Sequence, residues 1–143
     1  MKNIGLADPK AQDICIKSWQ ICERLGSPEG ELSLAQAVIY LALAPKSNAG
    51  YNAYKVAMED AKKTGSSPPP KHILNAATDL MRDQGYGDGY AYDHNVEDGF
   101  SGQNYFPDGM ERPEYYAPVE RGFERELSKR LSYFKNLRTK RSG

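Results

Sequence analysis

His94 and its neighbours are the residues of this chain whose types and spacing come nearest to a catalytic or metal-binding group. Asp93 precedes the histidine, and Glu97 follows it by three positions. A carboxylate beside an imidazole can orient a general base, or the two can bind one metal ion. Metal sites usually need three or four ligands, and neither the other histidine nor a cysteine lies close in the sequence. We therefore expect a structural hydrogen-bonding role for His94, and the alternative is a small enzyme that uses His94, Asp93 and Tyr92.

Motifs of other catalytic sites are missing from the sequence. A phosphate-binding loop would read GxxxxGKS or GxxxxGKT, so that its backbone amides cradle the phosphates, and neither occurs, nor do the GxSxG and HExxH motifs of hydrolases. Cys15 and Cys22 are the only cysteines. Seven residues apart on one helix they would lie about 10 Å from each other, too far for a disulfide, so we predict that both are small buried side chains. We expect no catalytic, cofactor-binding or metal-binding residues in this chain.

The elements that position these residues are expected to be helices. N-cap residues, prolines at first helical positions and glycines at helix ends accompany apolar residues at helical spacing. They predict helices between Pro9 and Gly26, between Pro28 and Pro45, from Asn48 to about Lys63 with Ser47 as N-cap, from about His72 to Gln84, and from Pro118 onward. The segment 86–120 is rich in tyrosine and glycine and is expected to form an ordered irregular wrap, with short strand pairing as the alternative.

The second of these helices is almost entirely apolar. Leu34 to Ala44 is a run of eleven residues in which only Gln36 is polar. This run is shorter than the roughly 18 residues that a membrane span needs. A helix that is apolar all round is either central in its domain or covered by a partner subunit. Four of its side chains are candidates for self-association, with burial inside one chain as the alternative: Val38, Tyr40, Leu41 and Leu43.

Charged residues are balanced over the whole chain but unevenly distributed. The sequence has 19 basic and 19 acidic residues, and this net charge of zero argues against binding nucleic acid or membranes through bulk charge. Residues 86–120 hold one basic and eight acidic groups, whereas residues 121–143 hold eight basic and two acidic groups. The basic C-terminal residues could contact DNA phosphates, lie on a solvated helix face, or pair with the acidic segment. The candidate DNA contacts are Arg125, Lys129, Arg130, Lys135, Arg138, Lys140 and Arg141.

Several motifs spread along the chain resemble those of one family. They are IGLADP at 4–9, PEGE at 28–31, LAQAVIYLALAPKSNA at 34–49, GYG at 85–87, YAYDH at 90–94, YYAP at 115–118 and RG at 121–122. In these stretches the chain resembles the C-terminal region of the replication-associated recombination protein A family. These proteins are the MgsA-type AAA+ ATPases, which are relatives of eukaryotic Werner-helicase-interacting protein. The positions that we take as structural motif residues are Pro45, Lys46, Ser47, Asn48, Tyr90, Tyr92 and His94.

The resemblance implies a fold and a domain organisation. It implies an all-α helical bundle that is similar to the collar of clamp loaders, with an irregular aromatic-rich C-terminal extension. The helical oligomerisation core would comprise residues 1–65, and residues 66–143 would form a family-specific extension packed as one unit with the core. The ATPase module and helical lid of the family would precede these residues, so the chain is expected to be a C-terminal fragment.

The resemblance also implies a function. The chain would hold together the tetramer of an AAA+ ATPase that acts in DNA replication, recombination, repair and the maintenance of stalled forks, without catalysis of its own. The alternative is a nucleic-acid-binding module that uses the basic C-terminal helix and tail. ATP and Mg would bind only in the ATPase module. The expected partners are further copies of the chain and, for the whole protein, DNA and single-strand-binding protein but no membrane. The expected location is the cytoplasm, in association with the nucleoid.

Overall fold

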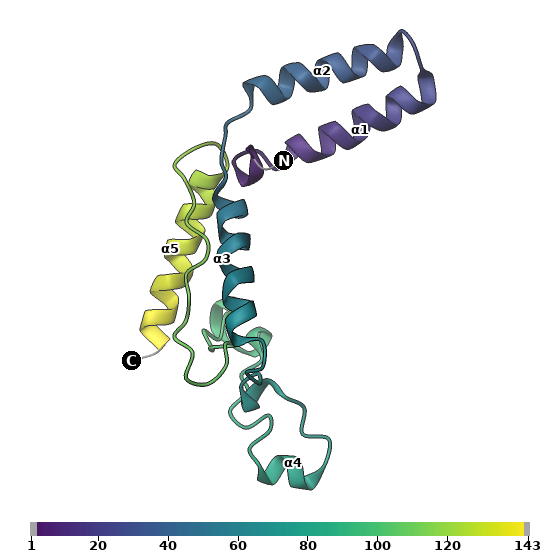
Figure 1. Ribbon diagram of the computed structural model, residues 1–143. Helices are drawn as coiled ribbons and strands as arrows, with labels where there is room; N and C mark the ends of the chain where they lie inside the picture. Colours follow the sequence, from purple (N-terminus) through teal and green to yellow (C-terminus); the bar gives the residue numbers. More distant parts are fainter. Residues whose placement is uncertain (1–2, 142–143) are drawn as a thin grey trace. The chain divides into compact units, whose positions relative to one another are not determined.

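The computed structural model describes residues 3–141, which form helices and irregular segments (Figure 1). The α-helices are α1 (Lys10–Leu25), α2 (Glu29–Leu43), α3 (Ala49–Thr64), α4 (Asp79–Asp83) and α5 (Glu124–Arg141). Short 3-10 turns occur at η1 (Gly5–Ala7), η2 (Lys71–Ile73), η3 (Asp93–Asn95) and η4 (Glu97–Gly99). No strand occurs in residues 3–141, so the predicted all-α class is confirmed.

These residues form two compact units, which we describe one at a time. Unit 1 contains the described residues up to Glu59 together with Tyr115–Leu131. Unit 2 contains Asp60–Glu114 together with the described residues from Ser132 onward. Each unit is therefore built from segments that lie far apart in the sequence.

The signals that begin and end the first helices act as the sequence predicts. The Asp8 carboxylate accepts a hydrogen bond from the Lys10 N–H (3.1 Å) at the start of α1. Gly26 ends this helix with a φ of 65°. The Ser47 hydroxyl oxygen accepts the Ala49 N–H (3.1 Å) at the start of α3. Local capping therefore contributes to each of these boundaries.

Helices α1 and α2 lie side by side in opposite directions and form a hairpin within unit 1 (Figure 1). They approach closely at Gly30, where an added Cβ would lie 2.7 Å from the Cα of Cys22. Glycine is needed here because any side chain would push the two backbones apart. Small buried residues on both helices allow the same close packing, among them Ala11, Ser18 and Ala37.

The apolar core of unit 1 is small. Ile4, Ala11 and Ala44 form a buried cluster, and Tyr40 and Leu41 are partly buried against it. Among residues 3–141, the buried apolar side chains belong to one isoleucine, one proline and five alanines. Most larger apolar side chains therefore keep part of their surface exposed.

The turn at Gly122 joins the C-terminal part of unit 1 to its first residues. The N–H of Phe123 donates a hydrogen bond to the carbonyl oxygen of Ala7 (2.8 Å). Gly122 has a φ of 54°, and an added Cβ would lie 2.1 Å from this oxygen and 2.6 Å from Pro45 Cγ. Both the backbone angle and the lack of space require glycine at this position.

Glu124, the first residue of α5, is a fully buried carboxylate. Its Oε1 accepts a hydrogen bond from the Ser47 hydroxyl (2.8 Å), and its Oε2 accepts the Val119 N–H (2.7 Å). Burial of a carboxylate is costly unless hydrogen bonds compensate for the lost water. Because the same Ser47 hydroxyl caps α3, Glu124 connects that helix start to the segment that precedes α5.

Tyr116 should make unit 1 less stable at alkaline pH. Burial raises the pKa of Tyr116 to about 12, and the negative charge of Glu124 adds to this shift. An unfolded tyrosine ionises at about pH 10. The stabilisation from this group is therefore complete below pH 10 and is lost as the pH rises toward 12.

We expect the unfolding free energy, measured by urea titration, to fall between pH 10 and 12. The Tyr116→Phe variant has no phenol proton to lose and should show a smaller fall over the same range. The other tyrosines serve as the internal control because the variant leaves them in place. Equal pH profiles for the two proteins would contradict the prediction.

The predicted helix from His72 to Gln84 is wrong in its first half. This region contains the η2 turn and then only the short helix α4. The Thr78 hydroxyl starts α4 by accepting the Met81 N–H (3.3 Å), and the carbonyl oxygen of Lys71 accepts the Gly87 N–H (2.9 Å). The side-chain cap at Thr78 and the backbone bond between Lys71 and Gly87 take the place of the regular hydrogen bonds of a continuous helix.

The last helix begins later than predicted. It starts at Glu124 instead of Pro118, because Gly122 takes a positive φ and the Glu124 carboxylate takes the Val119 N–H. On this helix Arg130 Nε lies 3.2 Å from a carboxylate oxygen of Glu126, four residues earlier.

The segment 86–120 is irregular, as predicted, and contains no strand. Side-chain hydrogen bonds to the backbone hold parts of it in place. The Gln103 side chain accepts the Ala91 N–H (3.0 Å) and donates to the Gly89 carbonyl oxygen (2.7 Å). The Gln103 side chain thus satisfies backbone groups that a neighbouring β-strand would otherwise bind.

Candidate functional site

One side of α2 is composed almost entirely of exposed apolar residues. Gly30 and Ala37 are buried on the other side, which faces α1. Leu43 is 82% exposed and Val38 is 65% exposed. A contiguous face of this kind marks an interaction site, whereas scattered apolar residues do not. We define the α2 outer face by its exposed members Leu32, Ala35, Val38, Ile39, Ala42 and Leu43.

The four candidates for self-association lie in two environments. Val38 and Leu43 belong to the α2 outer face. Tyr40 and Leu41 are half-buried against the core cluster. The Tyr40 hydroxyl donates a hydrogen bond to the Asp8 carboxylate (2.6 Å), and this bond raises the pKa of Tyr40. The first pair is therefore available to another molecule, and the second pair has intramolecular contacts.

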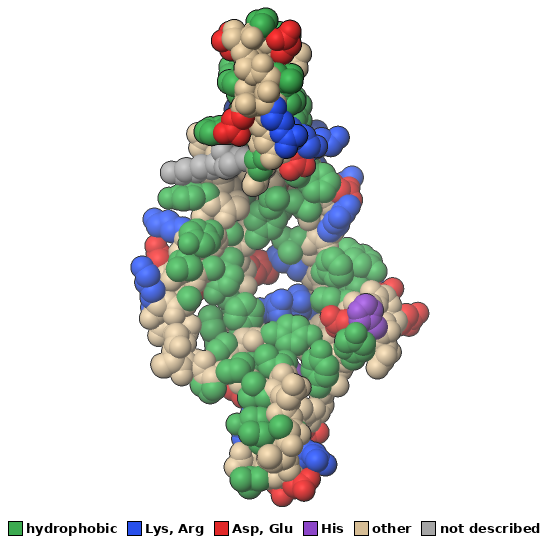
Figure 2. Space-filling view, turned by 90° about the vertical axis from the view of Figure 1, so that its right-hand side faces the viewer, with side chains coloured by type: hydrophobic (Ala, Val, Ile, Leu, Met, Phe, Trp, Pro, Cys, Tyr) green, Lys and Arg blue, Asp and Glu red, His purple; other side chains and the backbone are tan. Residues whose placement is uncertain are grey.

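Helix α1 carries exposed apolar residues of its own. Ile16 is 49% exposed and Trp19 is 64% exposed. Together with Cys15 they line a hollow of about 360 Å³. Cys15 and Cys22 are half-buried free thiols, whereas the sequence predicted buried ones. Figure 2 shows hydrophobic side chains, in green, in several groups over the visible surface.

No helix in the described residues, α2 included, is both long enough and apolar enough to cross a membrane.

In unit 1 the basic residues of α5 have partners nearby. Arg125 Nε donates to the Glu120 carbonyl oxygen (3.0 Å). Arg130 pairs with Glu126, and its Cζ lies 5.8 Å from the centre of the Phe123 ring. Lys129 is exposed in the same helix.

In unit 2 the basic residues of α5 contact the acidic segment that precedes the helix. Lys135 Nζ lies 2.6 Å from a Glu114 carboxylate oxygen. Arg141 lies 3.7 Å from the Asp98 carboxylate and also donates to the Glu97 carbonyl oxygen. Of the three interpretations of this basic helix, pairing with the acidic segment is therefore present at Lys135 and Arg141. Arg138 lies over an aromatic ring of unit 2, and Lys140 is exposed.

His94 and Asp93 point to different partners. The His94 ring packs on Tyr92, with ring centres 4.9 Å apart. The Asp93 carboxylate accepts the Ser101 N–H (2.7 Å), and hydrogen bonds from Ser101 lower the pKa of Asp93. In residues 3–141 no group of three or more His, Cys, Asp or Glu side chains is placed to hold a metal ion.

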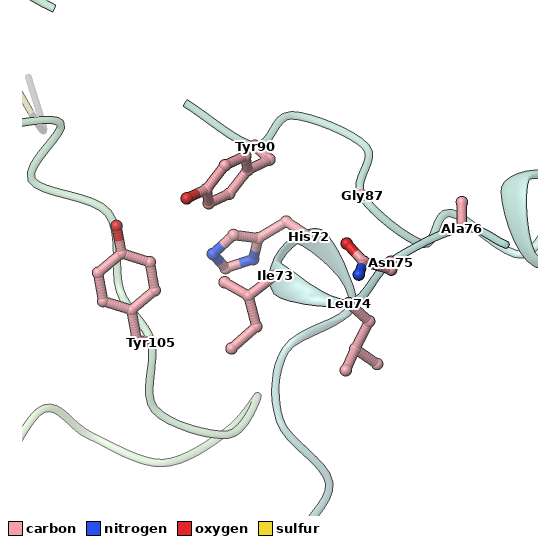
Figure 3. Close-up of a pocket in the computed structure, with 8 residues that line it drawn as sticks. All are labelled: His72, Ile73, Leu74, Asn75, Ala76, Gly87, Tyr90 and Tyr105. Carbon is pink, nitrogen blue, oxygen red and sulfur yellow. The ribbon is translucent and has the colours of Figure 1, made fainter. Parts of the chain in front are cut away.

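The pocket beside a histidine lies at His72 instead (Figure 3). It has a volume of about 370 Å³ and is lined by Tyr90 and Tyr105, among others. The His72 and Tyr105 ring centres are 6.2 Å apart. His72 Nε2 is buried and has no hydrogen-bond partner among the described residues. Tyr90 thus lines a pocket, although the sequence suggested only a structural motif residue.

The motif residues at 45–48 connect α2 to α3. Lys46 Nζ donates to the Leu41 carbonyl oxygen, which lies in the last turn of α2. The Ser47 N–H donates to the Asn3 carbonyl oxygen (3.0 Å). Pro45 faces the Gly122 turn, and Asn48 is exposed. This linker is therefore held from both sides within unit 1.

Two groups of residues were not singled out from the sequence. Glu124 was missed because its partners are distant in the chain, so no local pattern marks it. Leu32 and Ile39 were also missed, although Leu32, Ile39 and Leu43 follow a spacing of seven and four residues that places them on one side of a helix.

This chain is similar to known proteins over most of its length. The Replication-associated recombination protein A of Coxiella burnetii is 44% identical over 137 residues, covering 95% of this chain and 31% of that protein. The protein of the same name from Escherichia coli is 41% identical over 133 residues, covering 92% of this chain and 30% of that protein. ATPase WRNIP1 of Dictyostelium discoideum is 34% identical over 116 residues, covering 80% of this chain and 13% of that protein.

The chain therefore spans less than a third of the length of these relatives. The family profile described as "MgsA AAA+ ATPase C terminal" matches residues 1–135. Since both the profile and the relatives cover most of the sequence, the chain belongs to the MgsA AAA+ ATPase C-terminal family.

Proposed function

We propose that this chain is the self-association domain of a longer AAA+ ATPase and assembles as a tetramer, in the manner of a clamp-loader collar. The observation that carries the proposal is the α2 outer face, where Leu43, Val38 and Ile39 are all more than half exposed. A second copy of the chain is a suitable cover because the intramolecular core is built mainly of alanine. Small domains with little buried apolar surface are often stabilised by oligomerisation.

The energetics favour association through this face. Burial of apolar surface contributes roughly 25 cal/mol per Å². Obligate interfaces typically bury about 2,000 Å² or more and are more apolar than other surfaces. Glu31 and Gln36 are the polar residues among the exposed positions from 31 to 43. The Glu31 carboxylate of each chain would therefore have to lie at the edge of the interface, where water can solvate it. Ile16 and Trp19 on α1 could extend the apolar area.

The test is the molar mass in solution of the Val38→Glu/Leu43→Glu double variant. Two carboxylates placed in a buried interface would have to be desolvated without partners, which strongly disfavours assembly. We expect light scattering after size exclusion to give a tetramer for the unmodified chain and a monomer of 16.0 kDa for the double variant.

The matched control is Val56→Glu on α3. Val56 is 46% exposed and lies outside the α2 outer face, so this variant should keep the mass of the unmodified chain. A monomer for the unmodified chain at micromolar concentration would contradict the proposal. Dissociation of the Val56→Glu variant alone would place the interface on α3.

The role of the longer protein is part of the same proposal. Relatives carry the name Replication-associated recombination protein A, and one is named an ATPase. We propose that the longer protein acts on DNA with single-strand-binding protein, in the cytoplasm near the nucleoid, and that ATP and Mg bind outside the present residues. The chain itself would then contribute assembly without catalysis.

A further inference from the structure

Three arginines of unit 2 line one pocket. Its volume is about 500 Å³, within the range of roughly 300–1,000 Å³ that is typical of small-molecule sites. Arg138 and Arg141 come from the last turns of α5, and Arg112 comes from the irregular segment. The remaining polar lining comes from a loop that includes Ser101, Gln103 and Asn104. No carboxylate lines the pocket.

Each guanidinium group is held in place by a neighbour. Arg138 Cζ lies 5.0 Å from the centre of the Phe100 ring, and Arg112 Cζ lies 5.7 Å from the centre of the Phe106 ring. Such contacts orient a guanidinium over an aromatic face. The pocket is thus lined by positioned donors.

Arg141 offers a donor that the protein does not use. Its Nη2 donates to the Glu97 carbonyl oxygen. Its Nη1 is buried and has no hydrogen-bond partner among the described residues. A buried donor without a partner is costly, so an acceptor bound in the pocket would remove an existing penalty.

Hydrogen bonds also hold the loop that lines the pocket together with the arginines. The Ser101 N–H is held by the Asp93 carboxylate at 2.7 Å. The Asn104 side-chain oxygen accepts the Phe106 N–H at 3.3 Å. The polar wall of the pocket therefore needs little ordering when a ligand binds, which favours affinity.

The electrostatics of the pocket favour an anion. Burial lowers the pKa of Arg112, and repulsion from Arg138 lowers it further, while Glu114 acts in the opposite direction. Glu114 is also paired with Lys135, so its charge is shared between two cations. An anion between Arg112 and Arg138 would relieve their mutual repulsion.

We propose that this pocket binds a phosphate group, either as free phosphate or on a small phosphate ester such as a nucleotide. Guanidinium groups donate paired hydrogen bonds that match phosphate oxygens, and bonds between such charged groups are about twice as strong as neutral ones. Three of them around one pocket suit an anion that presents oxygens in several directions. This site is independent of the α2 outer face and of self-association.

The experiment is isothermal titration calorimetry at constant ionic strength, with inorganic phosphate, AMP and adenosine as probes. We expect one phosphate or AMP per chain and no binding of adenosine. Binding of AMP that is tighter than binding of phosphate would identify an ester as the preferred form. The Arg112→Gln and Arg138→Gln variants should each weaken phosphate binding by about tenfold or more, as expected for loss of a hydrogen bond between charged groups.

The matched control is Lys140→Gln, which removes one positive charge from the same helix outside the pocket lining. It should keep the affinity of the unmodified chain. Far-UV circular dichroism identifies variants that fail to fold, and Arg138→Lys supplies a second test because it keeps the charge but loses the paired donors. No phosphate or AMP binding at millimolar concentration would overturn the proposal. Equal weakening by Lys140→Gln would also overturn it, since binding would then follow net charge.

Discussion

The Gly122→Ala variant is expected to lose about 4 kcal/mol or more of unfolding free energy. The added Cβ would lie 2.1 Å from the Ala7 carbonyl oxygen and 2.6 Å from Pro45 Cγ. The alanine would also have to adopt a φ of 54°, which disfavours residues other than glycine. Relief of the clash would require the turn to move away and break the 2.8 Å hydrogen bond from the Phe123 N–H to Ala7.

The control for this prediction is Gly109→Ala. Gly109 also has a positive φ, of 79°, but an added Cβ there would meet no other atom within 4 Å. The control should lose only the free energy needed to hold an alanine at a positive φ, about 1–2 kcal/mol of unfolding free energy. Urea unfolding followed by circular dichroism measures both values. Similar losses for the two variants would mean that the close approach at Gly122 does not contribute to stability.

The Glu124→Ala variant is expected to lose about 3–5 kcal/mol of unfolding free energy. The substitution leaves the Ser47 hydroxyl and the Val119 N–H without their acceptor in a buried site. It also leaves a cavity where a fully buried side chain was packed. Each unsatisfied buried donor costs about 1–3 kcal/mol, and the cavity adds to that loss.

Two further substitutions separate the carboxylate from general effects of mutation. Glu126→Ala removes a carboxylate that is 47% exposed, so its cost should stay near 0.5 kcal/mol or less. Glu124→Gln keeps one acceptor oxygen but presents an N–H to the other partner, so its loss should be intermediate. A Glu124→Ala variant as stable as Glu126→Ala in urea unfolding would contradict the role given to the buried carboxylate.

Local signals were sufficient for much of the fold. The boundaries of α1 and α3 depend on Asp8, Gly26 and Ser47, which act on residues within one turn, so the sequence could predict them. The starts of α4 and α5 could not be predicted in this way. Thr78 begins a new helix inside an apolar repeat, and α5 begins where the Glu124 carboxylate takes the Val119 N–H.

The candidate surface could be predicted only in part. A helix that is apolar all round has no periodic pattern to show which side faces its partner, so Tyr40 and Leu41 were grouped with Val38 and Leu43. The close approach of Gly30 to Cys22 decides the orientation of α2, and that contact depends on the α1–α2 hairpin. The arginine pocket was likewise hidden, since Arg112 lies in a segment whose other charges are acidic.

The discontinuous make-up of unit 1 has a consequence for how the chain folds during synthesis. The ribosome synthesises α1 and α2 before residues 115–131. The Ala7 carbonyl oxygen and the Ser47 hydroxyl therefore have no native hydrogen-bond partners until Phe123 and Glu124 have been synthesised. The hairpin can form as soon as it emerges, whereas the unit is complete only after residues 115–131 have been made. In that interval the apolar hairpin is already exposed, so nascent chains on one messenger could meet through α2 before either has finished folding.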